Sequence, residues 1–265
     1  MELTILMPCL NEENTIANCI KKAKEFIEKN KIDAEILIAD NGSTDNSVQI
    51  SKSLGVRVVK IKEKGYGNAL RKGTINAKGK YVIIGDSDES YDFTNLECFI
   101  AKLKEGYDLV IGNRYGGKIE KGAMKFTHRY IGTPIISFVA RKKFKTNIKD
   151  FNSGLRGYNN EKIINLNCKA EGMEYASEMI IKAKKANLKI TEIPINFYKD
   201  KRKRKPHLNT IRDGLRHIKL IVNERWTEQG TDLLFINIDY KKTILYNRNE
   251  INFKKRRFIW LKLIT

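Results

Sequence analysis

The first 115 residues alternate short apolar runs with longer amphipathic stretches. The apolar runs, each ended by polar residues or glycine, are residues 3–7, 34–39, 56–61, 81–85 and 109–112. The amphipathic stretches between them are residues 16–30, 47–54, 69–77 and 96–104. Because short buried strands that alternate with helices are typical of βαβ units, this pattern predicts an α/β fold with a mainly parallel sheet flanked by helices.

The alternation ends after about residue 115. For the remainder we expect helices over residues 126–144 and 175–186, a structured loop over 150–158 and a strand over 189–195. A last amphipathic helix has its apolar positions at helical spacing, namely Leu208, Ile211, Leu215, Ile218 and Val222. The basic stripe of that helix, Arg212, Arg216 and Lys219, fits either a membrane-surface helix or a core-docked helix with a solvated face.

Acidic residues follow several of the predicted strands. Ligands of parallel α/β sheets bind at the carboxyl ends of the strands, so binding residues are expected in these loops. The loops after the first, second, fourth and fifth apolar runs read PCLNEE (8–13), DNGSTD (40–45), DSDES (86–90) and NRY (113–115). Three of the four contain carboxylates, which turn formation alone does not require.

Asp86 and Asp88 form the sharpest local signal, because two carboxylates two residues apart leave a strand together and can share one hard cation. Such cations are commonly held by one or two carboxylates plus substrate phosphates, so we expect these residues to bind Mg²⁺ or Mn²⁺. The cation would neutralise a diphosphate leaving group. Asp40 suits hydrogen bonding to a base or ribose, although an Asx-type turn with Asn41 and Gly42 also explains it, and both can hold at once.

A short glycine loop precedes one of the predicted helices. Gly65 and Gly67 could cradle a phosphate there, but helix capping explains them nearly as well. The loop after the first strand lacks the G-x-G-x-x-G pattern, which disfavours a dinucleotide-binding fold.

Taken in order, these motifs resemble the inverting GT-A glycosyltransferases of family 2, and within them the polyprenyl- and dolichyl-phosphate sugar synthases. The segments that carry the resemblance, all within residues 1–222, are MPCLNEE (7–13), ADNGSTD (39–45), KGYGNA (64–69), GDSD (85–88), GNRY (112–115), HRY (128–130), DFNSGLR (150–156) and GMEYASE (172–178). The resemblance implies a GT-A, Rossmann-like fold and a metal-dependent hexosyltransferase that uses a UDP-glucose-like sugar or GDP-mannose.

The resemblance also implies roles for individual residues. Binding of the nucleotide sugar would fall to Pro8, Leu10, Asn11, Glu12, Asp40, Gly65, Gly67, Asp86, Ser87, Asp88, Arg202 and Lys205. Arg114 and Arg129 would position an acceptor phosphate, since guanidinium geometry suits that task. Asp150 and Asp88 would lie near the reacting centre. For Arg129 and Asp150 a structural ion pair or cap is the alternative.

The acceptor class sets the chemistry that the site must supply. A sugar hydroxyl needs a general base, whereas a phosphate monoester is already largely anionic at neutral pH and needs positioning and charge neutralisation. The resemblance supplies two arginines, and His128, His207 and His217 are not assigned as bases. We therefore expect a polyprenyl or dolichyl phosphate acceptor, with a hydroxyl of a polysaccharide or glycan as the alternative.

The chain has 265 residues and a net charge of +20, and more than half of this excess lies from Lys199 onward. Such a charge favours an anionic partner, unless it merely decorates a solvated surface. A nucleic-acid-binding module is disfavoured because no binding motif is present and the acids cluster at strand ends. A sugar-1-phosphate nucleotidyltransferase should have a glycine-rich basic loop where this chain has Asn11, Glu12 and Glu13, and intact Asp86 and Asp88 argue against an inactive binding protein.

We expect a GT-A domain over residues 1–222 and a divergent basic tail over 223–265. The basic run 254–257 beside apolar residues 258–261 suits a membrane-interfacial anchor, or a tail without function. The four cysteines lack zinc or disulfide spacing, which indicates a reducing compartment, and no run approaches the roughly 20 apolar residues that span a bilayer. The prediction is a cytoplasmic protein, peripheral on the cytoplasmic face of the membrane and held there by lipid or by a membrane-protein partner.

Overall fold

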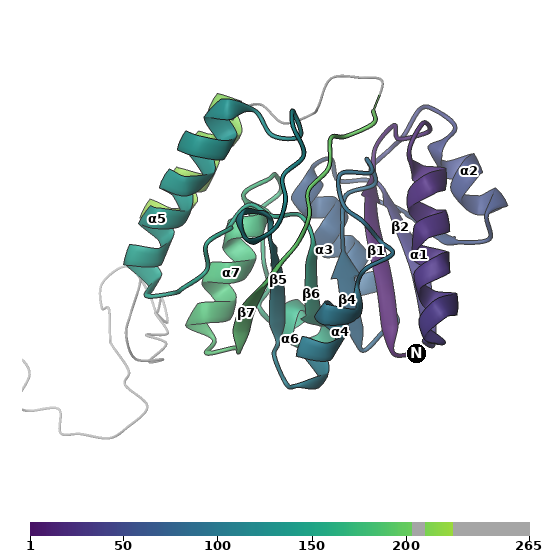
Figure 1. The fold of residues 1–265 in the computed structure, drawn as a ribbon, viewed down its shortest axis with the longest axis horizontal. Coiled ribbons are helices and arrows are strands. Elements are labelled where there is room, and N and C mark those ends of the chain that lie inside the picture. The colour runs from purple at the N-terminus through teal and green to yellow at the C-terminus, as the bar shows by residue number, and fades with distance from the viewer. Residues whose placement is uncertain (203–209, 225–265) are drawn as a thin grey trace, which may run out of the picture. The chain divides into compact units, whose positions relative to one another are not determined.

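A seven-stranded sheet with helices on both faces forms the framework of the protein (Figure 1). The computed structural model describes residues 1–202 and 210–224, which belong to one compact unit. The strands are β1 (Leu3–Cys9), β2 (Ala34–Asp40), β3 (Arg57–Lys60), β4 (Tyr81–Ile84), β5 (Leu109–Asn113), β6 (Arg156–Asn159) and β7 (Ile190–Pro194). The helices are α1 (Ile16–Asn30), α2 (Ser47–Ser53), α3 (Tyr66–Asn76), α4 (Glu97–Lys104), α5 (Thr133–Phe144), α6 (Asn160–Asn165), α7 (Tyr175–Lys185) and α8 (Thr210–Asn223).

The strand order in the sheet is β3-β2-β1-β4-β6-β5-β7. β1 pairs in parallel with β2 and β4, β2 with β3, and β5 with β7. Only β6 runs antiparallel among the described strands, between β4 and β5. The mainly parallel, Rossmann-like α/β sheet expected from the sequence is thereby confirmed.

The central strands are buried on both faces. In β1, Leu6 contributes to an apolar layer that includes Leu70 of α3 and Met179 of α7. The alternate side chain Ile5 contributes to a second layer, which includes Ile20 of α1. A strand that is covered on both faces needs apolar residues at every position, which is why the hydrophobic runs located β1, β2, β4 and β5.

The structured loop expected over residues 150–158 is wrong at its end, because Arg156–Asn159 forms β6. Arg156 lies opposite Ile84 on one side and Ile111 on the other. Its guanidinium group is buried and donates hydrogen bonds to main-chain carbonyl groups. A charged residue therefore occupies a core position of the sheet, and the hydrophobic pattern could not reveal the strand.

The helix expected over residues 126–144 contains a π-helical turn, His128–Gly132, directly before α5. The hydroxyl of Tyr115 donates to the carbonyl oxygen of Arg129 in this turn, at 3.1 Å. π-turns widen a helix locally and are frequent at functional sites. Here the turn brings His128 to the cavity described below.

Some of the predictions from the sequence concern residues that the structure does not describe. Lys205, Leu208 and the tail beyond residue 224 lie outside the described residues, and the division at residue 222 stays a prediction. Within residues 1–202 and 210–224, none of the helices combines the length and the apolar character needed to cross a bilayer.

Candidate active site

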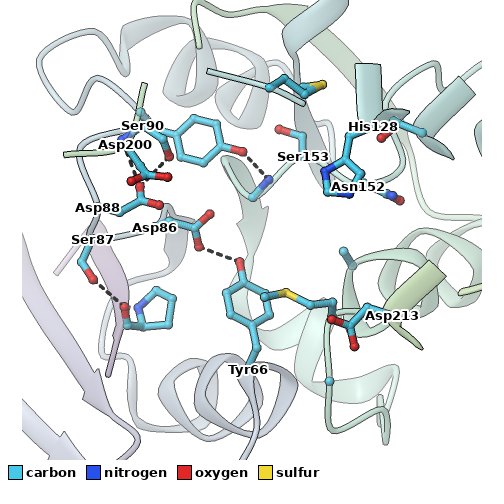
Figure 2. Close-up of a pocket in the computed structure, with 18 of the residues that line it drawn as sticks. Tyr66, Asp86, Ser87, Asp88, Ser90, His128, Asn152, Ser153, Asp200 and Asp213 are labelled. Carbon is cyan, nitrogen blue, oxygen red and sulfur yellow. Dashed lines mark hydrogen bonds between the residues drawn. The ribbon is translucent and has the colours of Figure 1, made fainter. Parts of the chain in front are cut away.

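A cavity of about 640 Å³ opens at the carboxyl ends of β1, β4 and β5 (Figure 2). This volume lies within the usual range for small-molecule sites. Figure 2 shows Asp86, Asp88 and Asp200 at one side of the close-up, and His128, Asn152 and Asp213 at the other. The loop after β4, the π-turn and α8 therefore line the same cavity.

Asp86 lies at the cavity wall, where the hydroxyl of Tyr66 donates to its Oδ1 at 2.8 Å. Burial and the nearby charge of Asp88 raise the pKa of Asp86 to about 6, against the opposing effect of the Tyr66 hydrogen bond. The backbone of Gly154 runs against this carboxylate, since a Cβ at residue 154 would lie 2.6 Å from Asp86 Oδ2. Two close carboxylates whose charges repel each other attract a cation.

Asp88 is buried and each of its carboxylate oxygens has a partner. Its Oδ1 accepts hydrogen bonds from the backbone nitrogen and the hydroxyl of Ser90, at 3.0 and 2.6 Å. Its Oδ2 lies 2.9 Å from Nη2 of Arg202. Between the two aspartates, the Ser87 hydroxyl donates to the carbonyl oxygen of Pro8 at 2.7 Å, which ties this loop to the end of β1.

The donor set at residues 86 and 88 fits a hard divalent cation. Both side chains offer carboxylate oxygens to the same cavity, and the guanidinium of Arg202 already pairs with Asp88. In the described part of the chain, no group of three or more His, Cys, Asp or Glu side chains is arranged to hold a metal by itself. Two carboxylates that share a metal with substrate phosphates match the usual mode of Mg²⁺ binding.

The residues expected in the nucleoside pocket divide into two groups. Pro8, Leu10 and Glu12 line the cavity, whereas Asn11 and Asp40 shape the loops around it. The carboxylate of Asp40 accepts hydrogen bonds from two main-chain nitrogens of residues 42 and 43, so the Asx-type turn is present. Asn11 accepts a 2.7 Å bond from the backbone nitrogen of residue 44, which joins the first two strand-end loops.

Asn41 is a cavity residue that the sequence patterns did not single out. Its side-chain amide donates to the carbonyl oxygen of Glu63 at 2.8 Å, and its Oδ1 accepts from the backbone nitrogen of Gly65 at 2.8 Å. One side chain therefore fixes the loop between β3 and α3. An Asn in a turn sequence gives no sign of such contacts, so only the fold reveals them.

The two glycines of this loop accommodate the backbone of another segment. A Cβ at Gly65, whose φ is 128°, would lie 2.3 Å from the carbonyl oxygen of Glu171. A Cβ at Gly67 would lie equally close to the carbonyl oxygen of Ala170. The backbone nitrogen of Gly67 also donates to Glu171 at 2.8 Å. Gly65 lines the cavity, and Gly67 serves the packing of residues 170–171 on α3.

Arg114 and Asp150, expected at the acceptor phosphate and at the reacting centre, bind each other. Nε and Nη2 of Arg114 donate to the two oxygens of Asp150 at 2.7 and 2.8 Å. Asp150 is fully buried, while Arg114 lines the cavity and lies over the ring of Phe197. The carboxylate raises the pKa of Arg114 against the effect of burial, so the guanidinium stays charged.

Arg129 lies on the π-turn, with its guanidinium over the ring of Tyr130, and it does not line the cavity. The basic side chains that do line this end are Lys125, Arg212 and Arg216. The sequence showed the two α8 arginines only as a stripe on an amphipathic helix, because their position over the cavity depends on how α8 packs.

His217 of α8 is a buried histidine at the cavity. Its Nδ1 lies 2.8 Å from the Ser177 hydroxyl, and burial together with the charge of Arg156 lowers its pKa to about 4. His128 also has a lowered pKa, chiefly through burial. Both imidazoles are neutral at physiological pH, and His217 is too weak a base to remove a proton from a hydroxyl efficiently.

Comparison with known proteins matches residues 4–166 to the model of glycosyl transferase family 2. The low-salt glycan biosynthesis hexosyltransferase Agl6 of Haloferax volcanii is 33% identical over 221 residues, which cover 83% of this chain and 53% of that protein. The chain thus spans about half the length of Agl6. Glycosyltransferase AglJ of the same organism is 30% identical over 79% of this chain and 67% of its own length.

Among solved structures, glucosyl-3-phosphoglycerate synthase from Mycobacterium tuberculosis, crystallised with Mn²⁺, UDP and phosphoglyceric acid, has a TM-score of 0.61 and 19% identity. The alignment covers 83% of this chain and 76% of the synthase, which establishes the GT-A fold. Together with the matched family model, the motifs at the strand ends identify the chain as a member of the family 2 glycosyltransferases.

Proposed function

We propose that this protein transfers a hexose, with inversion, from a nucleoside-diphosphate donor to the phosphate group of a polyprenyl or dolichyl phosphate. The donor is UDP-glucose or a related UDP-sugar, or GDP-mannose. The M. tuberculosis synthase was crystallised with Mn²⁺ and UDP, which supports a metal-assisted donor site of this class. Asp86 and Asp88 would hold the cation, which would neutralise the charge of the departing diphosphate.

The outer surface of α5 and α8 is the observation that carries the lipid acceptor. The two helices pack against each other (Figure 1). Their outward positions expose large apolar side chains by 38% to 61%, and these six residues are termed the interfacial face: Ile135, Phe138, Val139, Leu215, Ile218 and Val222. Exposed apolar surface of this kind marks an interaction site.

Positive charge accompanies the interfacial face. Lys142 lies over the ring of Phe138, and Arg216 and Lys219 are exposed on α8. Apolar side chains with neighbouring Lys and Arg suit the boundary between the acyl chains and anionic headgroups of a bilayer. A partner protein with a purely apolar surface would offer no counter-charge to these side chains. The composition of the face therefore favours a lipid surface.

The same two helices lead from the interfacial face to the cavity. Thr133 at the start of α5 lines the cavity, as do Arg212 and Arg216 near the start of α8. Helix N-termini carry partial positive charge, and the arginines add full charges. A lipid whose chain lies along the interfacial face would place its phosphate among these groups and Lys125.

A phosphate acceptor also matches the chemistry that the cavity offers. The second pKa of a phosphate monoester is about 6, so its oxygen is already anionic at neutral pH. Attack of this oxygen on the anomeric carbon, opposite the departing diphosphate, inverts the configuration. No proton must be removed, which agrees with a His217 whose pKa is about 4.

The decisive experiment is incubation with labelled UDP-glucose or GDP-mannose, Mn²⁺ and vesicles that contain polyprenyl phosphate. Label that extracts into organic solvent, and that is lost with Asp88→Asn, is the expected result. Label that stays in water-soluble saccharide would instead support the hydroxyl acceptor. Vesicles without polyprenyl phosphate are the control, because they separate transfer to this acceptor from transfer to other lipids.

A further inference from the structure

Arg202 lies among three carboxylates at the cavity. Its Nη2 is 2.9 Å from Asp88 Oδ2 and 3.2 Å from Asp200 Oδ2, and its Nη1 is 3.7 Å from Glu12 Oε1. The side chain is 16% exposed, and its buried Nε has no hydrogen-bond partner among residues 1–202 and 210–224. The guanidinium therefore neutralises acidic neighbours while one of its donors remains unused.

A strap formed by residues 197–202 holds Arg202 in this position. The backbone nitrogen of Tyr198 donates to the carbonyl oxygen of Ser90 at 3.0 Å, and that of Lys201 donates to the carbonyl oxygen of Asp88 at 3.1 Å. The strap thus runs along the loop that carries the two aspartates. The side chain of Lys201 points to a different carboxylate, Glu89 Oε2, at 2.9 Å.

The contact between Arg202 and Asp88 involves the carboxylate oxygen that a metal would use. Oδ1 of Asp88 is already engaged twice by Ser90, so Oδ2 is the oxygen left to coordinate a cation. A guanidinium at 2.9 Å and a divalent cation on the same oxygen would repel each other strongly in a buried setting. The two cations are therefore alternative partners of Asp88.

We propose that Arg202 is an internal counter-cation that divalent metal displaces from Asp88, and that the displaced guanidinium then binds the donor diphosphate. This inference rests on the proposed metal site. A diphosphate offers several oxygens to a guanidinium, including its unused Nε. When metal binds alone, Arg202 loses its ion pair with Asp88 and gains no new partner. When metal binds together with a nucleoside diphosphate, the diphosphate becomes the new partner of Arg202. Metal and nucleotide should consequently bind cooperatively.

The test measures binding rather than turnover. Mn²⁺ is titrated into the full chain without nucleotide, with free Mn²⁺ followed by electron paramagnetic resonance, and UDP is then titrated at saturating Mn²⁺. Arg202→Gln should bind Mn²⁺ alone about tenfold more tightly and UDP about tenfold more weakly, as expected for one charge–charge contact in a partly buried site. Lys201→Gln is the matched control, because it removes from the same strap a charged side chain that pairs with Glu89 rather than with the Asp88 carboxylate. This variant should change neither affinity by more than about twofold.

Each outcome decides a separate point. If Mn²⁺ binding is unaffected by Asp88→Asn, the metal site of the proposed function is wrong, and the exchange falls with it. If Asp88 is required but Arg202→Gln binds Mn²⁺ no more tightly than the wild type, the exchange alone is overturned. Circular dichroism verifies that the variant folds. Should it not fold, the wild-type protein provides the second test, because UDP must then raise its Mn²⁺ affinity, and equal affinities with and without UDP would refute the exchange.

Discussion

Asp150 and Arg114 form a buried ion pair with two parallel hydrogen bonds, Nε to Oδ2 and Nη2 to Oδ1, and the backbone nitrogen of Arg114 adds a third to Oδ2 at 3.1 Å. The pair links the end of β5 to the loop before β6. Because Arg114 also lines the cavity, the pair sets one wall of the site. The guanidinium is pre-positioned by its carboxylate rather than free to move toward a ligand.

Removing one member of this pair should lower the free energy of unfolding of the protein. Arg114→Ala leaves the fully buried Asp150 carboxylate without its charged partner, which typically costs about 3–5 kcal/mol. Urea unfolding followed by circular dichroism measures the change. Lys29→Ala, which breaks an exposed pair with Glu97 at 3.3 Å, is the control and should cost less than about 1 kcal/mol. An Arg114→Ala protein of unchanged stability would show that this pair does not stabilise the fold.

The sequence predicted those parts of the fold that depend on local pattern. Strands buried on both faces, such as β1 and β4, appear as apolar runs, and Asp86 and Asp88 follow directly from the end of such a run. The parallel order then places the loops after β1, β2 and β4 at one edge of the sheet. The fold and the position of the paired aspartates were therefore accessible without coordinates.

Contacts between distant segments were not accessible in this way. The partner of Asp150 is 36 residues away in the sequence. The partner of Asp88 is Arg202, which follows the last strand of the sheet. Residue type indicated that each could bind a ligand, with an ion pair as the alternative for Asp150, but it did not indicate which residue would be the partner. β6 escaped prediction for a related reason, since the Arg156 guanidinium is satisfied by backbone carbonyls that only the folded chain provides.

Gly67→Ala should destabilise the protein, because the new Cβ would lie 2.3 Å from the carbonyl oxygen of Ala170. Neither backbone can shift freely, so overpacking should cost about 1–3 kcal/mol. Thermal unfolding gives the measurement. Gly214→Ala in α8 is the matched control, because a Cβ there meets no atom of the described residues within 4 Å. Helix propensity alone should stabilise this variant by up to about 1 kcal/mol. Equal stability of Gly67→Ala and the wild type would contradict the close packing of residues 170–171 on α3.

Charge placed on the interfacial face should weaken binding to anionic vesicles. Ile135→Glu and Phe138→Glu replace side chains that are 51% and 53% exposed. Each apolar side chain that is buried in the membrane interface contributes about 1.5–3 kcal/mol. The partition coefficient of each variant should therefore fall about tenfold or more. Vesicle co-sedimentation measures this. Ile75→Glu, at a 54% exposed position on α3, should bind as the wild type does. A similar loss for all three variants would point to net charge rather than to the face, and a change in oligomeric state by light scattering would point to a second copy of the chain.

The buried His217 makes stability depend on pH. Its pKa falls to about 4 in the folded protein, against an ordinary value near 6.5, because burial and the charge of Arg156 outweigh the opposing effect of Asp213. Between these two values the unfolded chain binds a proton that the folded chain does not, so stability is full above about pH 6.5 and is lost as the pH falls toward 4. From pH 7 to pH 5 the loss from this group should be about 2 kcal/mol.

His217→Asn keeps a polar group near Ser177 but cannot take up this proton, so its stability should fall by about 2 kcal/mol less over the same range. Urea unfolding of both proteins at the two pH values gives the difference, in which the contributions of other groups cancel, and parallel pH profiles would show that the imidazole is charged in the folded protein.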